Sequence, residues 1–130
     1  MSAISSVRAG NVIGGGDLSE DRLIPDIVRA IKGKSKVSIR NPAATRPWQH
    51  VFEPLNGYLM VAEDLFENGF QNNSSWNFGP LITDIRSVDE VTKLFCSIWG
   101  DIDIIEYDDS PQPHEANLLS LDVSKSYHEL

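Results

Sequence analysis

Two arginines in a segment rich in turn-forming residues, Arg40 and Arg46, are the side chains best suited to bind a small anion. A guanidinium can fork onto two phosphate oxygens, and the following Pro47-Trp48 pair restricts how far the backbone beside Arg46 can move. The residues alone therefore favour Arg46 as a phosphate ligand. The alternative is an ordinary ion pair with one of the 19 acidic side chains of the chain.

Residues 14–16, three glycines after a short strand, invite comparison with dinucleotide-binding loops, whose glycines let the backbone approach a pyrophosphate at a helix N-terminus. The spacing does not fit, because Ser19 occupies the third small position of that pattern. Asp17, Glu20 and Asp21 also place negative charge where a phosphate would lie. We therefore expect no cofactor-binding residue here and interpret the glycines as part of a mobile loop on the substrate side.

No catalytic residue is expected in this chain. A common dehydrogenase arrangement needs a Tyr four residues before a Lys, so that the ammonium lowers the pKa of the phenol that acts as base. At that spacing Tyr58 is followed by Ala62 and Tyr107 by Pro111, and Tyr127 would need a residue after the last one.

No metal site is expected either. His50, His114 and His128 lie far apart in the sequence and are interpreted as surface or hydrogen-bonding residues. The single cysteine, Cys96, lies in an apolar stretch with helical spacing, which indicates a thiol in the core.

Composition excludes several classes of partner. The chain has 130 residues, 11 Lys plus Arg and 19 Asp plus Glu, so its formal net charge of -8 disfavours nucleic acid. No window approaches the roughly 18 apolar residues of a membrane span, and the N-terminus does not look like a signal peptide. We expect a cytoplasmic protein without a membrane partner. The composition does not exclude binding of a small phosphorylated ligand.

The hydrophobic pattern predicts alternating strands and helices, which is typical of an α/β protein. Strands are expected at 4–7 with 12–13, 36–40, 76–78 and 102–107, and the segment 43–48 is expected to be a loop. Helices are expected from about residue 23 to Gly33 with Asp21 as the cap, at 54–67, from Ser87 to Trp99, and from Asp122 or Ser124 onward. The first strand and last helix look cut short, so residues 1–130 are predicted to be a single partial domain, truncated at both ends.

Four segments resemble, in order and spacing, the CDP-glucose 4,6-dehydratase branch of the extended short-chain dehydrogenase/reductases. They are Arg8–Asp17, Asp21–Asp26, Arg46–Val51 and Trp76–Pro80. The resemblance implies that the chain is the C-terminal nucleotide-sugar-binding portion of such an enzyme, with the Rossmann half absent.

The resemblance also assigns substrate contacts. It implies that Asn11 lies near the substrate diphosphate, that Arg46 binds the diphosphate, and that Ile39 lies beside the base. The backbones of Leu23 and Ile24 are expected against the nucleobase. The remaining candidates are Arg22, in the same motif, and His114 and Glu115, in a late segment that closes over the ribose and phosphate.

In such enzymes, lyases of deoxysugar biosynthesis for lipopolysaccharide O-antigen, NAD takes hydride from C4 of the hexose, water leaves across C5 and C6, and hydride returns to C6. NAD is thus the cofactor of the full-length family, and none is expected on this chain alone. The implied partners are a nucleotide sugar, CDP-glucose, and a complementary Rossmann-domain chain. Because that half is missing, we predict that the chain alone neither binds NAD nor turns over CDP-glucose.

Two alternatives remain open at this point. The chain could be a fragment of a related nucleotide-sugar epimerase, decarboxylase or dehydratase with a different base specificity. It could also be a non-enzymatic interaction module from a truncated gene, with an exposed apolar edge that binds another protein.

Overall fold

The computed structural model describes residues 2–100, 103–108, 110 and 116–130. The chain packs as two compact units. Unit 1 consists of Met1–Gly14, Pro47–Ile85 and Ser120–Leu130, and unit 2 consists of Gly15–Arg46 and Arg86–Leu119. The expected α/β class is confirmed, whereas the single partial domain over residues 1–130 stays a prediction.

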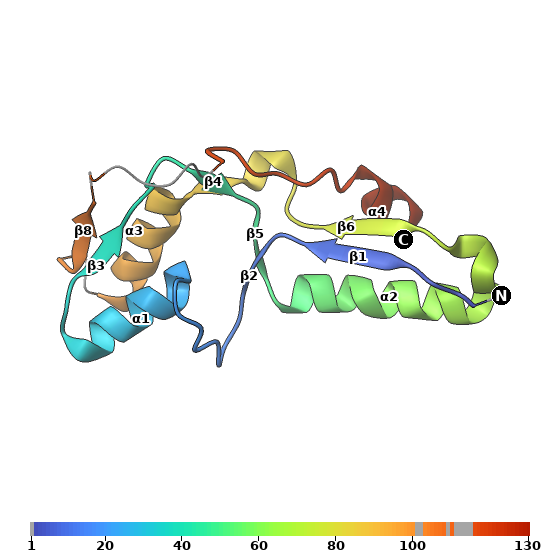
Figure 1. Ribbon diagram of the computed structural model, residues 1–130, viewed down its shortest axis with the longest axis horizontal. Coiled ribbons are helices and arrows are strands. Elements are labelled where there is room, and N and C mark those ends of the chain that lie inside the picture. Colours follow the sequence, from blue (N-terminus) through green and yellow to red (C-terminus); the bar gives the residue numbers. More distant parts are fainter. Residues whose placement is uncertain (1, 101–102, 109, 111–115) are drawn as a thin grey trace. The chain divides into compact units, whose positions relative to one another are not determined.

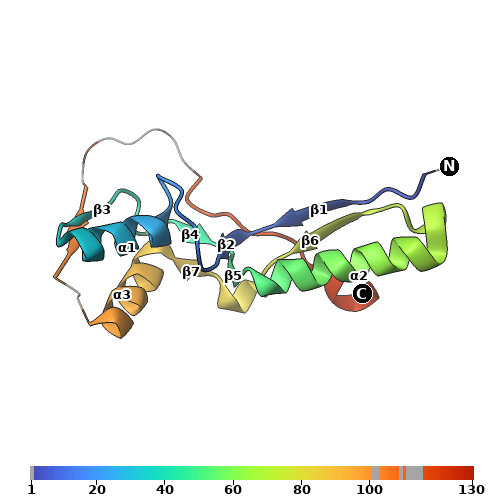
Figure 2. The ribbon, with the colours of Figure 1, turned by 90° about the horizontal axis from the view of Figure 1, so that it is seen from below.

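Unit 1 is built on two pairs of parallel strands. Strand β1 (Ser6–Ala9) pairs with β6 (Ser75–Phe78), and β2 (Asn11–Ile13) pairs with β5 (Trp48–His50). Figures 1 and 2 both show the long helix α2 running alongside β1 and β6. The unit is completed by α2 (Phe52–Asn68), the short 3-10 helices η1 (Gly69–Asn72) and η2 (Ile82–Asp84), and α4 (Ser124–Glu129).

One face of α2 packs closely on β6. Pro54, Gly57 and Val61 are the buried residues of this helix, and they recur at helical spacing. Tyr58 contacts Phe78 edge to face, with ring centroids 5.6 Å apart. Because Gly57 has no side chain, the helix can approach the Phe78 ring closely.

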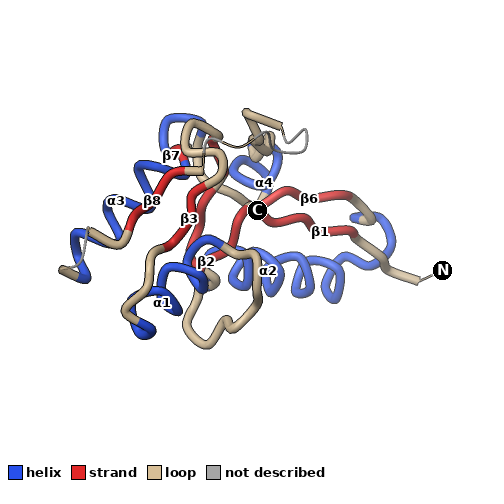
Figure 3. The backbone as a smooth tube through the Cα atoms, turned by 60° about the vertical axis from the view of Figure 1, so that its left-hand side comes forward, coloured by secondary structure: helices blue, strands red, loops and turns tan. Residues whose placement is uncertain are grey.

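Unit 2 is a unit of helices and short strands around a small apolar core. Figure 3 colours the helices blue and the strands red. Helix α1 (Leu23–Gly33) packs against α3 (Val88–Trp99) and against β3 (Val37–Ile39). Strand β3 is parallel to β8 (Ile105–Tyr107), and β4 (Thr45–Arg46) is antiparallel to β7 (Arg86–Ser87). The buried core residues are Ile27, Ala30, Val37, Ile39, Cys96 and Ile104.

The helices agree with the expectations from periodicity. Helix α3 begins where it was predicted, because Ser87 and Glu90 form a reciprocal capping box. The Ser87 side chain accepts a hydrogen bond from the Glu90 N–H at 3.1 Å, and the Glu90 carboxylate accepts one from the Ser87 N–H at 2.7 Å. Cys96 is fully buried, which confirms the core thiol.

Three local predictions are wrong. Asp21 does not cap α1, because Arg22 is the N-cap, without a side-chain hydrogen bond, and Asp21 adopts a left-handed backbone with φ 58°. The N-cap of α4 is Val123, and the Asp122 carboxylate instead accepts a hydrogen bond from the Ser124 N–H. The segment 43–48 is not a continuous loop, because it contributes β4 and the start of β5, which pair with distant segments.

Candidate anion-binding site

Arg46 is buried in unit 2, with 7% of its surface exposed. Its Nη1 donates hydrogen bonds to the carbonyl oxygens of Thr45, at 2.8 Å, and Ala116, at 2.9 Å. A guanidinium carries its N–H donors in a rigid planar fork, so these two bonds help to fix its orientation.

The backbone around Arg46 is held from both sides. On one side β4 pairs with β7. On the other, the Thr45 N–H donates to the Asn117 carbonyl at 2.8 Å, and the Leu119 N–H donates to the Thr45 carbonyl at 3.3 Å. Arg46 is therefore placed by a ribbon of three chain segments, which is the rigid support that a specific anion contact requires. The bridge from Thr45 to Leu118 was not predicted, because it spans about seventy residues and leaves no local signal in the sequence.

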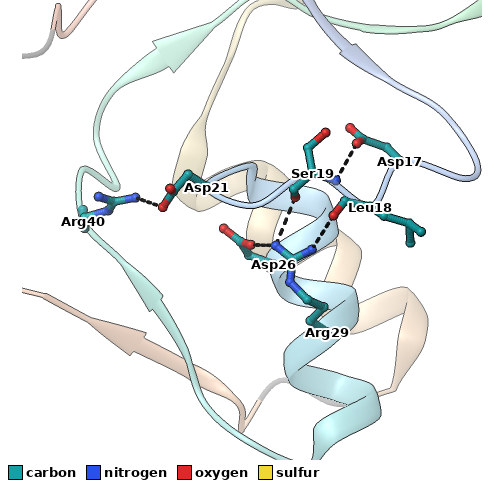
Figure 4. Close-up of polar contacts among 7 residues, drawn as sticks. All are labelled: Asp17, Leu18, Ser19, Asp21, Asp26, Arg29 and Arg40. Carbon is teal, nitrogen blue, oxygen red and sulfur yellow. Dashed lines mark hydrogen bonds and ion pairs between the residues drawn. The ribbon is translucent and has the colours of Figure 1, made fainter.

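The loop before α1 is fastened to that helix by Arg29, as Figure 4 shows. Arg29 donates from Nη1 to the Leu18 carbonyl at 3.1 Å and from Nη2 to the Ser19 carbonyl at 3.0 Å, and it also pairs with the Asp26 carboxylate. The Ser19 N–H bonds the Asp17 carboxylate at 3.0 Å, and this bond lowers the pKa of Asp17. Sequence reasoning missed Arg29, although its position three residues after Asp26 on a helix was a usable signal.

Arg40, the other arginine of the candidate segment, forms an ion pair with Asp21 at 3.3 Å (Figure 4). Both side chains are largely exposed, and such surface pairs contribute about 0 to 1 kcal/mol. The contact of Arg40 with Asp21 is therefore an ordinary surface ion pair.

The other predicted contacts are distributed over the two units. In unit 2, Arg22 is exposed at the start of α1, and Leu23 and Ile24 pack against the apolar core. Ile39 is a member of that core with 2% of its surface exposed. In unit 1, Asn11 is half-buried in β2, and its N–H donates to the Pro47 carbonyl at 2.9 Å. His114 and Glu115 lie outside the described residues.

The glycines at 14–16 do not stand directly before a helix. Helix α1 begins only at Leu23, so the glycines do not lead into its N-terminus. Gly14 has a packing role instead, because a Cβ there would lie 2.9 Å from the Cγ1 of Val51. Around Gly15 and Gly16 the structure places nothing within 4 Å of such a Cβ.

The described residues offer neither a metal-ligand cluster nor a membrane-spanning helix. Across the described ranges, no group of three or more His, Cys, Asp or Glu side chains is arranged to hold a metal ion. The described helices also include none that is long and apolar enough to cross a bilayer.

Replacing Arg29 with Ala is expected to loosen residues 17–22 without unfolding unit 2. The variant loses two hydrogen bonds to the loop backbone and one ion pair, which together contribute about 1 kcal/mol at a partly exposed position. Hydrogen exchange of the Ser19 amide should become several-fold faster. Lys32→Ala, at an exposed position on the same helix, is the matched control and should leave that exchange unchanged. Equal exchange in the two variants would contradict a fastening role for Arg29.

Solved structures show which fold the chain shares. A UDP-glucose-4-epimerase from Stenotrophomonas maltophila, solved with NAD and formylated UDP-arabinopyranose, matches with a TM-score of 0.82 at 16% identity, over 98% of this chain and 42% of that chain. A dTDP-glucose 4,6-dehydratase from Streptomyces venezuelae, solved with NAD bound, matches with a TM-score of 0.77 at 20% identity, over 95% of this chain and 36% of that chain. The fold is therefore that of part of an extended short-chain dehydrogenase/reductase.

Comparison of the amino-acid sequence with known proteins finds a similar enzyme. CDP-glucose 4,6-dehydratase of Salmonella typhimurium (strain LT2) is 48% identical over 127 residues, which cover 98% of this chain and 35% of the relative. The resemblance drawn from the motifs is confirmed, and the chain spans about a third of that enzyme's length, in its C-terminal part. No protein-family model matches the chain.

Proposed function

We propose that this chain is the nucleotide-sugar-binding part of an NAD-dependent CDP-glucose 4,6-dehydratase, in which Arg46 binds the substrate diphosphate. The observation that carries the proposal is the buried Arg46 guanidinium, oriented by the carbonyls of Thr45 and Ala116. A guanidinium held in one orientation is well suited to make charge-assisted hydrogen bonds to the oxygens of a phosphate. The 48% identity to CDP-glucose 4,6-dehydratase supports the choice of substrate.

The remaining contacts follow the same assignment. Asn11 approaches the diphosphate, and the backbone of Leu23 and Ile24 lies against the base. Because Ile39 is almost fully buried, it contributes by supporting Leu23 and Ile24 from the core. Arg22, His114 and Glu115 complete the proposed set of contacts.

The chain alone is proposed to be inactive, because its sequence lacks the Tyr and Lys pair of the family at the required spacing. Its glycine run also does not suit NAD, whereas the structural neighbours are NAD-bound enzymes. NAD is therefore expected on a complementary Rossmann-domain part, and a cytoplasmic location belongs to the same proposal.

An apolar stripe on α2 is the proposed docking surface for that part. The stripe consists of Phe52, Leu55, Leu59 and Phe66, which are exposed by 71%, 46%, 70% and 91%. It lies on a different side of the helix from Pro54, Gly57 and Val61, which pack inward. The occupant we propose is a Rossmann-type domain, because the chain spans only 35% of its relative and β1–β6 is a two-stranded parallel sheet, a kind that normally belongs to a larger one.

The test is complementation in trans. The N-terminal part of the Salmonella typhimurium enzyme that this chain does not match is co-expressed with it, and formation of a 4-keto sugar from CDP-glucose and NAD is measured. We expect product with both parts, none with either part alone, and at least about tenfold lower kcat/KM with dTDP-glucose or UDP-glucose. Leu59→Asp should abolish complementation, whereas Glu63→Gln, at an exposed polar position on the same helix, should not.

The same experiment separates the alternatives. Preference for a UDP- or dTDP-sugar would identify a related epimerase or dehydratase fragment. Failure to form a complex, together with no nucleotide-sugar binding, would overturn the proposal. The exposed stripe on α2 would then favour a non-enzymatic module that binds another protein.

A further inference from the structure

Gln49 is a buried polar residue of the Arg46–Val51 segment, and the proposed function assigns it no role. It lies in β5 with 8% of its surface exposed. A buried side-chain amide is normally hydrogen-bonded, so its partner indicates what the side chain holds in place. The Gln49 Nε2 donates a hydrogen bond of 2.9 Å to the carbonyl oxygen of Phe78, at the end of β6.

The carbonyl oxygen of Phe78 joins two pairs of strands within unit 1. Besides the bond from Gln49, it accepts a hydrogen bond of 3.1 Å from the Gly10 N–H, at the corner between β1 and β2. A carbonyl oxygen has two lone pairs, so it can accept both bonds. Gln49 is therefore a cross-link between the β2–β5 pair and the β1–β6 pair.

The residue that follows Gly10 is Asn11, the proposed contact of the substrate diphosphate. The Asn11 N–H donates to the Pro47 carbonyl at 2.9 Å, and Asn11 lies opposite Trp48 in the β2–β5 register. The backbone of Asn11 is thus held by the β1–β2 corner and by the pairing with β5, and both supports are bonded to the Phe78 carbonyl. A side chain that binds a ligand has to be held within about half an ångström of its working position.

We propose that Gln49 is a positioning residue for substrate binding, whose hydrogen bond to Phe78 fixes the backbone from which Asn11 contacts the diphosphate. This inference rests on the proposed function and extends it to a residue that does not itself contact the substrate. When the Gln49 amide is removed, the Phe78 carbonyl keeps the Gly10 N–H as a donor, so no buried acceptor is left unpaired. Affinity is therefore expected to change more than stability.

The experiment measures binding of CDP-glucose by the complex of this chain with the Salmonella typhimurium N-terminal part. Gln49→Met keeps the length of the side chain and removes the donor, so it should weaken binding by about five- to tenfold. Gln49→Asn keeps the amide but is one methylene too short for the bond, and the same loss is expected.

Ser126→Ala is the matched control. The Ser126 hydroxyl donates to the next carbonyl of β6, that of Asn77, at 2.6 Å, but it does so from α4 and not from β5. This variant should change the affinity by less than about twofold. A thermal unfolding midpoint within about 3 °C of wild type shows that each variant remains folded.

A double-mutant cycle with Asn11→Ala tests whether Gln49 acts through Asn11. If it does, Gln49→Met weakens binding by less than about twofold once residue 11 is alanine. The full loss in that background would indicate a general structural effect and would overturn the inference.

The outcomes separate this inference from the proposed function. If Arg46→Ala loses CDP-glucose binding and both Gln49 variants bind like wild type, the role of Gln49 is overturned and the proposed function stands. Equal weakening by Gln49→Met and Ser126→Ala would also overturn the inference. If wild type does not bind CDP-glucose, both proposals fail.

Discussion

Gly10→Ala is expected to destabilise unit 1 by about 3 kcal/mol. Gly10 lies at the corner between β1 and β2. A Cβ added there would lie 2.3 Å from the carbonyl oxygen of Pro47 and 2.9 Å from the Cγ of Pro47. That oxygen is backbone, and it accepts a hydrogen bond from the Asn11 N–H, so it cannot move aside without breaking the start of the β2–β5 pairing. The clash therefore has no inexpensive relief.

Urea unfolding measures this effect, and the chain provides a matched control. Gly15→Ala makes the same substitution five residues later, where nothing lies within 4 Å of the added Cβ and the backbone angle is not left-handed. We expect the free energy of unfolding of Gly15→Ala to stay within about 0.5 kcal/mol of wild type, or to rise slightly because the unfolded chain loses freedom. Equal stability of Gly10→Ala and Gly15→Ala would show that the β1–β2 corner does not pack on Pro47.

The helices were predictable because their signal is local. Helices α1 and α3 each carry apolar residues at helical spacing over about three turns, and each has a local boundary signal, Gly33 at the end of α1 and Ser87 before α3. The predicted and observed bounds of α2 differ by only two residues at the start and one at the end. In these segments helix propensity, apolar periodicity and end signals all agree, so the local sequence alone is sufficient to predict the helix.

Strands β4, β5 and β7 were not predictable, because their hydrogen bonds go to distant segments. Trp48 pairs with Asn11 and Thr45 pairs with Ser87, so nothing within residues 43–50 distinguishes these strands from the turns around them. The same holds for the support of Arg46. Its residue type indicated a phosphate ligand, but only the fold brings the Ala116 carbonyl to its guanidinium.

The apolar residues that the resemblance assigns to the nucleobase are also residues that pack the core of unit 2. Leu23, Ile24 and Ile39 fit the apolar periodicity of α1 and β3, and the core of unit 2 accounts for their side chains without any ligand. Their side chains are therefore explained by packing, and any role in recognising a base has to come from the backbone of Leu23 and Ile24. Substituting these side chains would test folding more than binding, which makes Arg46 the better residue on which to test the site.

Arg46→Ala is expected to weaken binding of CDP-glucose by at least about a hundredfold in the complex with the Salmonella typhimurium N-terminal part, or about 2.7 kcal/mol. The substitution removes the proposed charge-assisted contact to the diphosphate from a buried position, where such contacts are strongest. It also removes the hydrogen bonds to the carbonyls of Thr45 and Ala116, so a loss of about 1 to 3 kcal/mol in stability is expected as well.

The two effects can be separated by measuring binding and unfolding on the same variants. Arg46→Lys keeps the charge but loses the planar fork, so it should recover part of the affinity while remaining less stable than wild type. Arg40→Ala removes an arginine whose partner is the exposed Asp21 carboxylate, and it should change affinity by less than about threefold. If Arg46→Ala is folded and binds CDP-glucose as tightly as wild type, Arg46 is only a structural link between β4 and residues 116–119. If Arg46→Lys restores affinity more than stability, the charge acts on the ligand, because a purely structural role would make the two losses rise and fall together.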